Sequence, residues 1–351
     1  MKYREVEPEE LLILENSAIV DVRSPSEYRE FHIPRAVNIP VFDDNEKKLI
    51  GLIYRNEGAP MAFEKGREFA LKKLPSILER FKDLTSNYES VIVYCWRGGM
   101  RSKGVCEALS RQGLKVMRLR GGYRAYRKFI LKKMSDLLEQ KDLIVITGKT
   151  GTGKTRIIKH LKKEGFPAVD LEGIAKHRGS LFGRVGIKEQ ITQKMFDSLL
   201  FEDLWKLDGS YLIVEDESRR IGNIHIPDSL WEKKENGYFV EVRVPLSERI
   251  RIIHEDYTST EGWEDEVLSA LMRLKKFLGN RKLILATELF KSGRVEELIE
   301  FIIKEHYDKR YRTFKKPNKV IECGSLEECL NETKLFLFEY EGKVQNCPAK
   351  G

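Results

Sequence analysis

Two short stretches of this sequence combine residue types suited to binding and attacking anions. The first runs from Cys95 to Ser102, reads Cys-Trp-Arg-Gly-Gly-Met-Arg-Ser, and directly follows the apolar run 91–94. Adjacent glycines let successive N–H groups point inward as an anion-binding nest, and the arginines favour a thiolate. We therefore expect Cys95 to be a catalytic nucleophile rather than a buried structural cysteine. The residues expected to bind an anion beside it are Trp96, Arg97, Gly98, Gly99, Arg101 and Ser102.

The second stretch, 148–155, reads Gly-Lys-Thr-Gly-Thr-Gly-Lys-Thr and follows the apolar run 143–146. It fits the phosphate-binding pattern G-x-x-x-x-G-K-[ST], in which loop N–H groups and a helix N-terminus cradle phosphates. The pattern predicts phosphate binding, but it does not show that the phosphate belongs to ATP. The residues expected to bind it are Gly148, Thr150, Gly151, Thr152, Gly153, Lys154 and Thr155.

Polar residues gather in two segments downstream of the second loop. Residues 169–183 are rich in polar side chains and glycine, and 214–222 place three acids at the end of an apolar run. In P-loop enzymes a carboxylate at such a strand end holds a metal or acts as a base. The alternatives are a solvated turn for the acids and a structural role for an isolated histidine. We expect substrate contacts or support of the site from Asp170, Glu172, His177, Arg178, Ser180, Glu215, Glu217 and Arg219.

Strands alternate with helices along the chain, which predicts an α/β fold with parallel sheets covered by helices. A length of 351 residues favours two domains, and we place them at 1–138 and 139–351. Residues 247–307 read as amphipathic helices, a helical C-terminal part of the second domain. The strands are predicted at 18–23, 36–40, 91–94, 116–119, 143–147, 211–214, 238–242 and 319–322.

Composition bounds the class of protein. Hydrophobic residues make up 41% and charged residues 34%, typical of a globular protein with a charged surface. No apolar run approaches the roughly 20 residues of a membrane span, and the N-terminus lacks the apolar core of a signal peptide. We therefore expect a cytoplasmic protein without membrane association. The five cysteines have neither metal-ligand spacing nor a paired pattern, so we expect no bound metal cluster and no disulfide framework.

Positive charge is unevenly distributed. Residues 111–133 contain nine Lys or Arg and no Asp or Glu, and 309–316 form a second basic stretch. Aromatic residues interleave with the first, so it could hold a phosphate backbone; the alternative is a solvated helix face. Two such patches favour a polyanionic partner. The residues expected to contact its backbone are Arg118, Arg120, Arg124, Arg127, Lys128, Arg310 and Arg312.

The first third of the chain resembles the rhodanese domain, a sulfurtransferase fold that carries sulfur on cysteine. Residues 19–23, 27–28 and 32–40 look like that family's Asp-x-Arg, Glu-Phe/Tyr and His-Ile-Pro-x-Ala-x-Asn elements. Rhodanese loops usually span six residues, whereas Cys95 to Arg101 spans seven, the Cys-x5-Arg length of certain phosphatases. Phe31 replaces a common glycine, and we expect this to matter little for chemistry.

The order of motifs over residues 18–316 resembles the tRNA 2-selenouridine synthase family. Asp-Leu-Glu-Gly-x-Ala-x-His-Arg-Gly-Ser begins at Asp170, and Glu-x-Glu-x-Arg-x-Ile-Gly begins at Glu215. Residues 121–127 and 305–311 also look like elements of that family, and the seven-residue cysteine loop belongs to its pattern. The resemblance implies a rhodanese-like domain followed by a P-loop NTPase-like α/β domain with a helical C-terminal part.

The resemblance implies a tRNA-modifying activity at the wobble uridine of the anticodon loop. The family converts 2-thiouridine to an S-geranyl intermediate with geranyl diphosphate, then to 2-selenouridine with selenophosphate. The P-loop would bind the diphosphate, with Lys154 stabilising the departing charge, and the Cys95 loop would bind selenophosphate or carry selenium as a selenosulfide. Trp96 would either stack on the target base or pack the loop. A magnesium ion at Thr155 is left open, as is an enzyme that supplies selenophosphate.

Three alternatives stay open at this stage. An ATP-dependent rhodanese-type tRNA sulfurtransferase would use the P-loop to activate an acceptor and Cys95 to hand over sulfur. A Cys-x5-Arg phosphatase fused to a nucleotide-binding module would hydrolyse aryl phosphates without tRNA. A rhodanese domain acting only as a binding module would tolerate loss of the Cys95 thiol.

Overall fold

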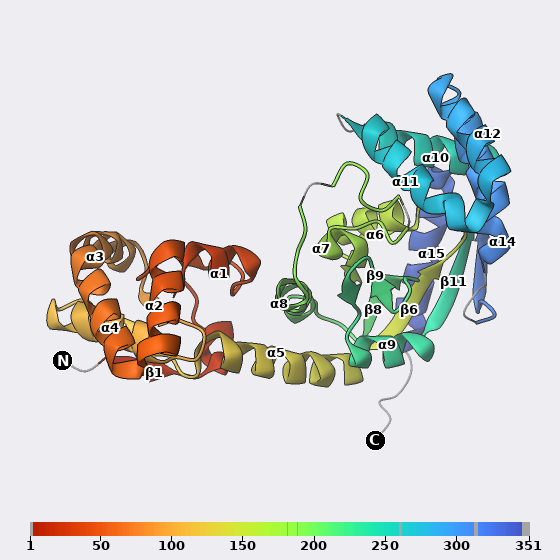
Figure 1. The fold of residues 1–351 in the computed structure, drawn as a ribbon. Coiled ribbons are helices and arrows are strands. Elements are labelled where there is room, and N and C mark those ends of the chain that lie inside the picture. The colour runs from red at the N-terminus through yellow and green to blue at the C-terminus, as the bar shows by residue number, and fades with distance from the viewer. Residues whose placement is uncertain (1–2, 181, 188, 260–261, 312–314, 346–351) are drawn as a thin grey trace. The chain divides into compact units, whose positions relative to one another are not determined.

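The computed structural model describes residues 3–345 except 181, 188, 260–261 and 312–314 (Figure 1). The chain divides into two compact units. The first comprises residues 1–134 and 191–202, and the second comprises 135–190 and 203–351. The division near residue 134 lies close to the predicted one, but the return of 191–202 to the first unit was not predicted. In the described part, no helix is long and apolar enough to cross a membrane.

The first unit is built on a five-stranded parallel sheet. Apolar residues fill its central strands continuously, as expected where helices cover both faces. Four of these strands were predicted, and the short first strand was not. In spatial order the strands are β1 (Arg4–Val6), β5 (Met117–Leu119), β4 (Ser90–Tyr94), β2 (Ser17–Asp21) and β3 (Val37–Asn38).

One face of this sheet packs on α3 and α4, through side chains such as Phe81 and Leu109. Two helices of the unit begin at side-chain caps: Ser24 and Asp43 each form a capping box with a glutamate three residues on. The helices of the unit are η1 (Pro8–Leu12), α1 (Pro25–Glu30), α2 (Asp44–Glu57), α3 (Ala59–Asn87), α4 (Met100–Arg111), most of α5 (Gly122–Glu139) and most of α8 (Gln193–Trp205).

Helix α8 completes the core beside α5, although the P-loop segment separates the two in sequence. Buried residues of α5 recur at helical spacing at Tyr123, Tyr126 and Ile130. The Tyr123 hydroxyl lies 3.1 Å from Ser198 Oγ of α8, and the Phe129 ring packs edge-on against Phe201. The apolar stripe of α5 is therefore covered by a segment made later in the chain.

The second unit contains another five-stranded parallel sheet. A small antiparallel pair, β9 (Arg220–Ile221) and β10 (Ile224–His225), lies outside it. The predicted strands are confirmed, and the two-residue strand β7 was too short to predict. In spatial order the sheet contains β12 (Lys319–Glu322), β11 (Tyr238–Arg243), β6 (Asp142–Thr147), β8 (Tyr211–Glu215) and β7 (Ala168–Val169).

Two helices far apart in sequence, α6 and α15, share one core with this sheet. Ile158 of α6 and Leu337 of α15 are both fully buried in it. A separate apolar core joins the helices that follow β11, which confirms the helical C-terminal part. The helices of the unit are α6 (Lys154–Lys163), α7 (Leu171–Ala175), α9 (Asp228–Glu235), α10 (Leu246–Thr258), α11 (Trp263–Leu278), α12 (Asn280–Lys291), α13 (Val295–Ile302), η2 (Ile303–Tyr307), α14 (Asp308–Arg310) and α15 (Leu326–Gln345).

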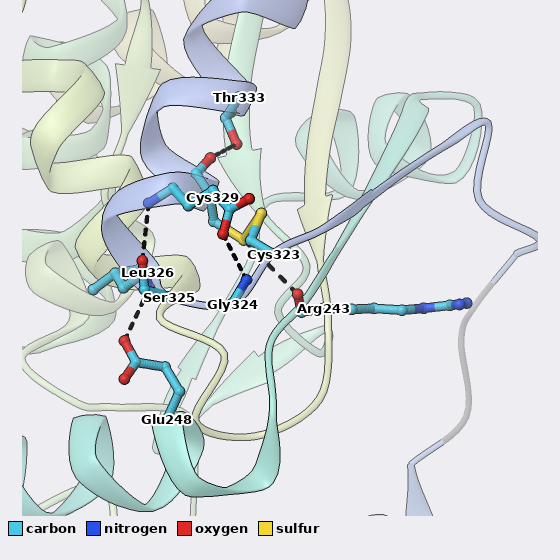
Figure 2. The surroundings of a disulfide bond; sticks show 9 residues. Arg243, Glu248, Cys323, Gly324, Ser325, Leu326, Cys329 and Thr333 are labelled. Carbon is cyan, nitrogen blue, oxygen red and sulfur yellow. Dashed lines mark hydrogen bonds between the residues drawn. A yellow bond between two sulfur atoms is a disulfide. The ribbon is translucent and has the colours of Figure 1, made fainter.

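A disulfide between Cys323 and Cys329 links the end of β12 to the first turn of α15, with the Cα atoms 5.5 Å apart (Figure 2). The sequence predicted no disulfide framework, so this pair is a correction. An odd cysteine count does not exclude one local pair across a tight turn. Inside the turn, the Leu326 N–H donates to Glu248 at 2.9 Å. The Leu326 side chain lies directly against the P-loop, because a Cβ added at Gly153 would come within 2.5 Å of it.

Candidate functional site

The cysteine loop begins where β4 ends, and alternation along that strand points the Cys95 side chain toward α4. Cys95 is 3% exposed, and its Sγ lies 3.3 Å from the hydroxyl of buried Ser102. Gly98 has φ of +61°, a conformation that favours glycine, and this lets the loop curl back over the strand end. The thiol therefore lies at the base of a tightly wound loop.

A second glycine pair, Gly121 and Gly122, was not predicted as part of the site. It begins the segment whose backbone packs against the cysteine loop and holds it in place; we call this contact the clamp. The N–H of Tyr123 donates to the carbonyl of Cys95 at 2.9 Å, and the N–H of Arg124 to that of Trp96 at 3.0 Å. Gly122 has φ of +60°, and a Cβ there would lie 2.2 Å from the Cys95 oxygen. Only glycine fits this approach. The signal in the sequence was Gly-Gly directly after the strand 116–119.

The arginines around the cysteine loop differ in whether they are already paired. Arg101 donates to Glu27 at 2.7 Å; burial opposes ionisation of that carboxyl, but the Arg101 bond holds its pKa below the usual range. Arg97 is exposed and forms no ion pair with any residue that the structure describes. Arg118 donates to the Gly98 carbonyl at 2.6 Å, bracing the loop. Arg97 is thus the arginine available to an incoming anion.

Aromatic side chains form a wall beside the loop. Trp96 stacks on Tyr123 with ring centroids 5.9 Å apart and meets the edge of Phe31 at 5.6 Å. The Lys194 ammonium lies 4.0 Å from the Phe31 ring centroid and 5.1 Å from that of Trp96. Phe31 was expected to matter little, yet its buried ring helps to orient Trp96. Trp96 packs the loop while staying half exposed, so the two predicted roles are compatible.

The Asp-x-Arg motif forms a buried ion pair. Arg23 and Asp21 are fully buried, and the guanidinium donates to the carboxylate at 2.6 Å and to the Phe31 carbonyl at 2.6 Å. The guanidinium also lies 4.6 Å from the Phe31 ring centroid. The motif therefore supports the aromatic wall rather than contacting an anion.

The residues predicted to contact a nucleic-acid backbone divide into two groups. Arg118 and Arg120 pair with Glu5, and Arg127 pairs with Asp197 at 2.7 Å. Arg124 and Lys128 are exposed one turn apart on α5. Because the other three are already paired with acids, Arg124 and Lys128 are the better candidates for contact with a nucleic-acid backbone in this segment. In the second segment Arg310 lies against Phe277 and hydrogen-bonds His306 at 2.8 Å, and Arg312 lies outside the described residues.

The P-loop joins β6 to α6 as predicted. Gly151 and Gly153 have φ of +85° and +82°, and buried Thr152 donates to the Lys149 carbonyl at 2.9 Å. Lys154 donates to the Gly148 carbonyl at 2.9 Å, so its ammonium bridges the loop. The N–H groups before α6 and this ammonium can bind phosphate oxygens together.

Two buried carboxyls lie under the P-loop threonine. Thr155 Oγ1 is 2.7 Å from Glu172 and 2.9 Å from Glu215. Burial raises the pKa of Glu172, and burial together with the Glu172 charge raises that of fully buried Glu215 well above its usual value. A hydroxyl has one proton, so one of the two carboxyls carries a proton and donates to it.

A third acid and a short loop form the rim. Burial, followed by the Glu172 charge, raises the pKa of Glu217 to about 8. Ser180 lies 3.2 Å from the Tyr257 hydroxyl, and the Arg178 guanidinium is 4.8 Å from the Tyr257 ring centroid. The open cavity above the P-loop measures about 1,050 Å³. Predicted residues that line it are Gly148, Thr150, Gly151, Gly153, Lys154, Thr155, Glu172, Arg178, Ser180 and Glu217.

Five predicted residues do not line this cavity. Thr152 and Glu215, described above, are buried beneath it, and the other three have different roles. Asp170 caps α7 by accepting from the Gly173 N–H at 2.7 Å. Arg219 is exposed and pairs with Asp228. His177 lies between two glycine backbones and accepts from the Gly179 N–H at 3.1 Å, and burial lowers its pKa. His177 is therefore a neutral support for the rim, the alternative that the sequence left open.

The C-terminal segment contributes residues that were not predicted. Arg249 donates to Asp308 at 2.7 Å and to the Thr150 carbonyl at 2.8 Å, which ties that segment to the P-loop. Tyr307 and Tyr311 line the cavity. Among the described residues, no group of three or more His, Cys, Asp or Glu is arranged to hold a metal.

Two family models match this chain, one in each half. Residues 141–335 match the model of the tRNA 2-selenouridine synthase AAA domain, and residues 7–129 match that of the rhodanese-like domain. A tRNA 2-selenouridine synthase from Sulfurovum sp. is 30% identical over 94% of this chain and 96% of its own length. The tRNA 2-selenouridine synthase from Nitrosomonas europaea is 34% identical, over 78% of this chain and 72% of its own length. A solved rhodanese-related protein from Thermoplasma volcanium is 22% identical, covering 36% of this chain and 93% of its own, with a TM-score of 0.23.

Proposed function

This chain belongs to the tRNA 2-selenouridine synthase family, and from that premise we propose that it replaces the sulfur of wobble 2-thiouridine in tRNA by selenium. The observation that carries the proposal is the presence of two separate anion-binding loops in one chain. One loop has a cysteine at its base, and the other has a lysine bridging a phosphate cradle. A reaction with two different anionic co-substrates uses both.

In the first step the P-loop binds geranyl diphosphate. The base sulfur attacks C1 of the geranyl group, the C1–O bond breaks, and diphosphate leaves with the electron pair while N3 of the base loses its proton to water. Lys154 and the loop N–H groups stabilise the charge that develops on the leaving oxygen. Thr155 with Glu172, whose carboxyl lines the cavity 2.7 Å from the threonine hydroxyl, would hold a magnesium ion, which would supply further positive charge to the diphosphate.

In the second step the Cys95 loop binds selenophosphate. Selenium bonds to C2 of the base, water takes the phosphoryl group to give phosphate, and geranylthiol departs with a proton. Cys95 is the residue expected to contact selenium, and Arg97 to contact a phosphoryl oxygen. A selenosulfide on Cys95 is less favoured, because selenium in selenophosphate is at the selenide level and forming a sulfur–selenium bond requires an oxidant.

The tRNA would approach the first unit along Arg124 and Lys128. Unstacked anticodon-loop bases can stack on aromatic side chains, and the half-exposed Trp96 offers such a face. An enzyme that makes selenophosphate would be the upstream partner.

Mass spectrometry of tRNA nucleosides tests the order of steps. The protein is incubated with 2-thiouridine tRNA and geranyl diphosphate, and selenophosphate is added afterwards. We expect geranylated nucleoside first and 2-selenouridine second. Selenation without geranyl diphosphate, or ATP hydrolysis coupled to product formation, would contradict the proposal and favour the ATP-dependent sulfurtransferase alternative.

A further inference from the structure

The P-loop cavity continues into a second pocket of different character. This neighbouring pocket, about 580 Å³ including the space open to solvent, has a lining that is almost wholly apolar. Both lie within the second unit and share Thr150, Ile253, Tyr257 and Tyr307. We name it the helical pocket, because its other lining residues come mainly from α10, α11, α13 and η2. They are Phe182, Thr258, Trp263, Val267, Val295, Leu298, Ile299, Ile302 and Ile303.

None of the described residues that line the helical pocket has a charged side chain, and its wall is almost entirely aliphatic or aromatic. Val267, Leu298 and Ile302 belong to the apolar core of the helical part, so the pocket is an opening in that core. The phosphate-binding residues lie next to it, since Ile253 would touch a Cβ added at Gly151 of the P-loop within 2.7 Å. An anion cradle and an apolar pocket thus meet at one boundary.

We propose that the helical pocket binds the isoprenoid tail of an allylic diphosphate whose head occupies the P-loop. This inference rests on the proposed function and adds the part of the enzyme that selects the tail. A purine base would have to leave its polar edge unpaired in such a pocket, at a cost that disfavours ATP. An isoprenoid has no polar group to satisfy, and each buried methylene stabilises binding by about 0.8 kcal/mol.

The position of the boundary also suits the chemistry. Tyr257 and Tyr307 line both cavities. The carbon that joins tail to diphosphate would therefore lie beside two aromatic side chains. Aromatic faces stabilise positive charge, and an allylic carbon gains positive character as diphosphate leaves.

Another apolar groove could accept a tail, and it supplies a control. It lies in the first unit between α2, α3 and α4, with a volume of about 1,100 Å³, and its lining includes Leu71, Leu74 and Met100. It borders the cysteine loop rather than the P-loop. The helical pocket shares lining residues with the P-loop cavity and this groove shares none, so we assign the tail to the helical pocket.

Binding measurements on the full chain test the proposal. The ligands are geranyl diphosphate and inorganic diphosphate, and the variants are Ile299→Trp in the helical pocket and Leu71→Trp in the other groove. We expect Ile299→Trp to weaken geranyl diphosphate binding about tenfold, the loss of roughly two buried methylenes, and to leave inorganic diphosphate unchanged. Leu71→Trp should change neither. Retained binding of inorganic diphosphate shows that the variant has folded.

A second substitution acts in the opposite direction. Ile299→Ala enlarges the helical pocket and should shift preference from geranyl toward farnesyl diphosphate. The unmodified protein should bind geranyl diphosphate more tightly than inorganic diphosphate. If both Ile299 variants keep that preference, the assignment of the tail to the helical pocket is wrong, while the proposed function stands. If the unmodified protein has no such preference, both are overturned. A loss confined to Leu71→Trp would move the tail to the other groove.

Discussion

The Cys95 loop and the P-loop follow parallel strands in the same way, yet their surroundings differ. The Cys95 loop is held by backbone contacts from Gly122 and Arg124, and its Arg101 is already neutralised by Glu27. The P-loop has two buried carboxyls beneath it and an apolar pocket beside it. The first suits a small anion held mainly by N–H groups. The second suits a substrate with a charged head and an apolar tail.

The sharpest way to break this comparison is to remove the thiol. Cys95→Ala should lower the rate of selenation of geranylated tRNA by about a thousandfold, because the group that contacts and orients selenium is lost, and leave geranylation unchanged. The control is Cys106→Ala, since burial raises the pKa of that thiol to about 12 and it faces the core. Rates of both steps are measured by nucleoside mass spectrometry. Full selenation with lost geranylation would reverse the assignment of the loops.

The reciprocal substitution is Lys154→Ala. We expect geranylation to slow by about a hundredfold to a thousandfold, because one preorganised charge is lost from the leaving diphosphate. Selenation of tRNA that already carries the geranyl group should proceed normally. The exposed Lys159 on the same helix offers the control Lys159→Ala, with little expected change. Equal slowing of both steps by Lys154→Ala would mean that the loops do not act separately.

The rigidity of the first loop can be tested at its clamp. Gly122→Ala adds a Cβ that would lie 2.2 Å from the Cys95 oxygen, so we expect about 2–3 kcal/mol of lost stability and slower selenation. Gly113→Ala, at φ of +80° with open space around it, should cost about 1 kcal/mol and leave selenation unchanged. Urea unfolding and selenation rates provide the two readouts. Similar effects of the two substitutions would contradict a clamp.

The smallest predicted effect concerns tRNA. Arg124→Ala should weaken tRNA binding a few-fold and lower the slope of log K against log salt by about one contact. Arg120→Ala, whose side chain is paired with Glu5 and Glu7, should do less. Fluorescence titrations at several salt concentrations measure both. A larger loss of tRNA affinity for Arg120→Ala than for Arg124→Ala would mean that the tRNA backbone contacts the Arg120 side of residues 111–133 instead.

Local patterns predicted the elements that position the site. Apolar runs followed by glycine-rich loops were enough to place β4, β6 and both loops, because these motifs depend on neighbours in sequence. The buried state of Glu215 could not be read from three acids in a row, since only the packed sheet decides which of them faces inward. The pairing of Arg118 with Glu5 depends on adjacent strands at opposite ends of the first unit's chain.

The amino-acid composition of α8 did not determine to which domain this helix belongs. An apolar stripe on α8 indicates burial, but it does not say against which sheet. For this reason 191–202 was assigned to the second domain by position in sequence, whereas it packs with the first unit. The helical pocket escaped notice for a related reason. Its lining comes from helices whose apolar residues read, one helix at a time, as ordinary core.

The return of α8 has a consequence for synthesis of the chain. Ribosomes add roughly 5–20 residues per second, so Tyr123 and Ile130 wait several seconds for the helix that covers them. During that time the whole P-loop is made and leaves the ribosome before the first unit can close. A nascent chain therefore leaves the apolar stripe of α5 exposed until α8 has been made. Premature release after β7 would yield a cysteine loop without its finished support.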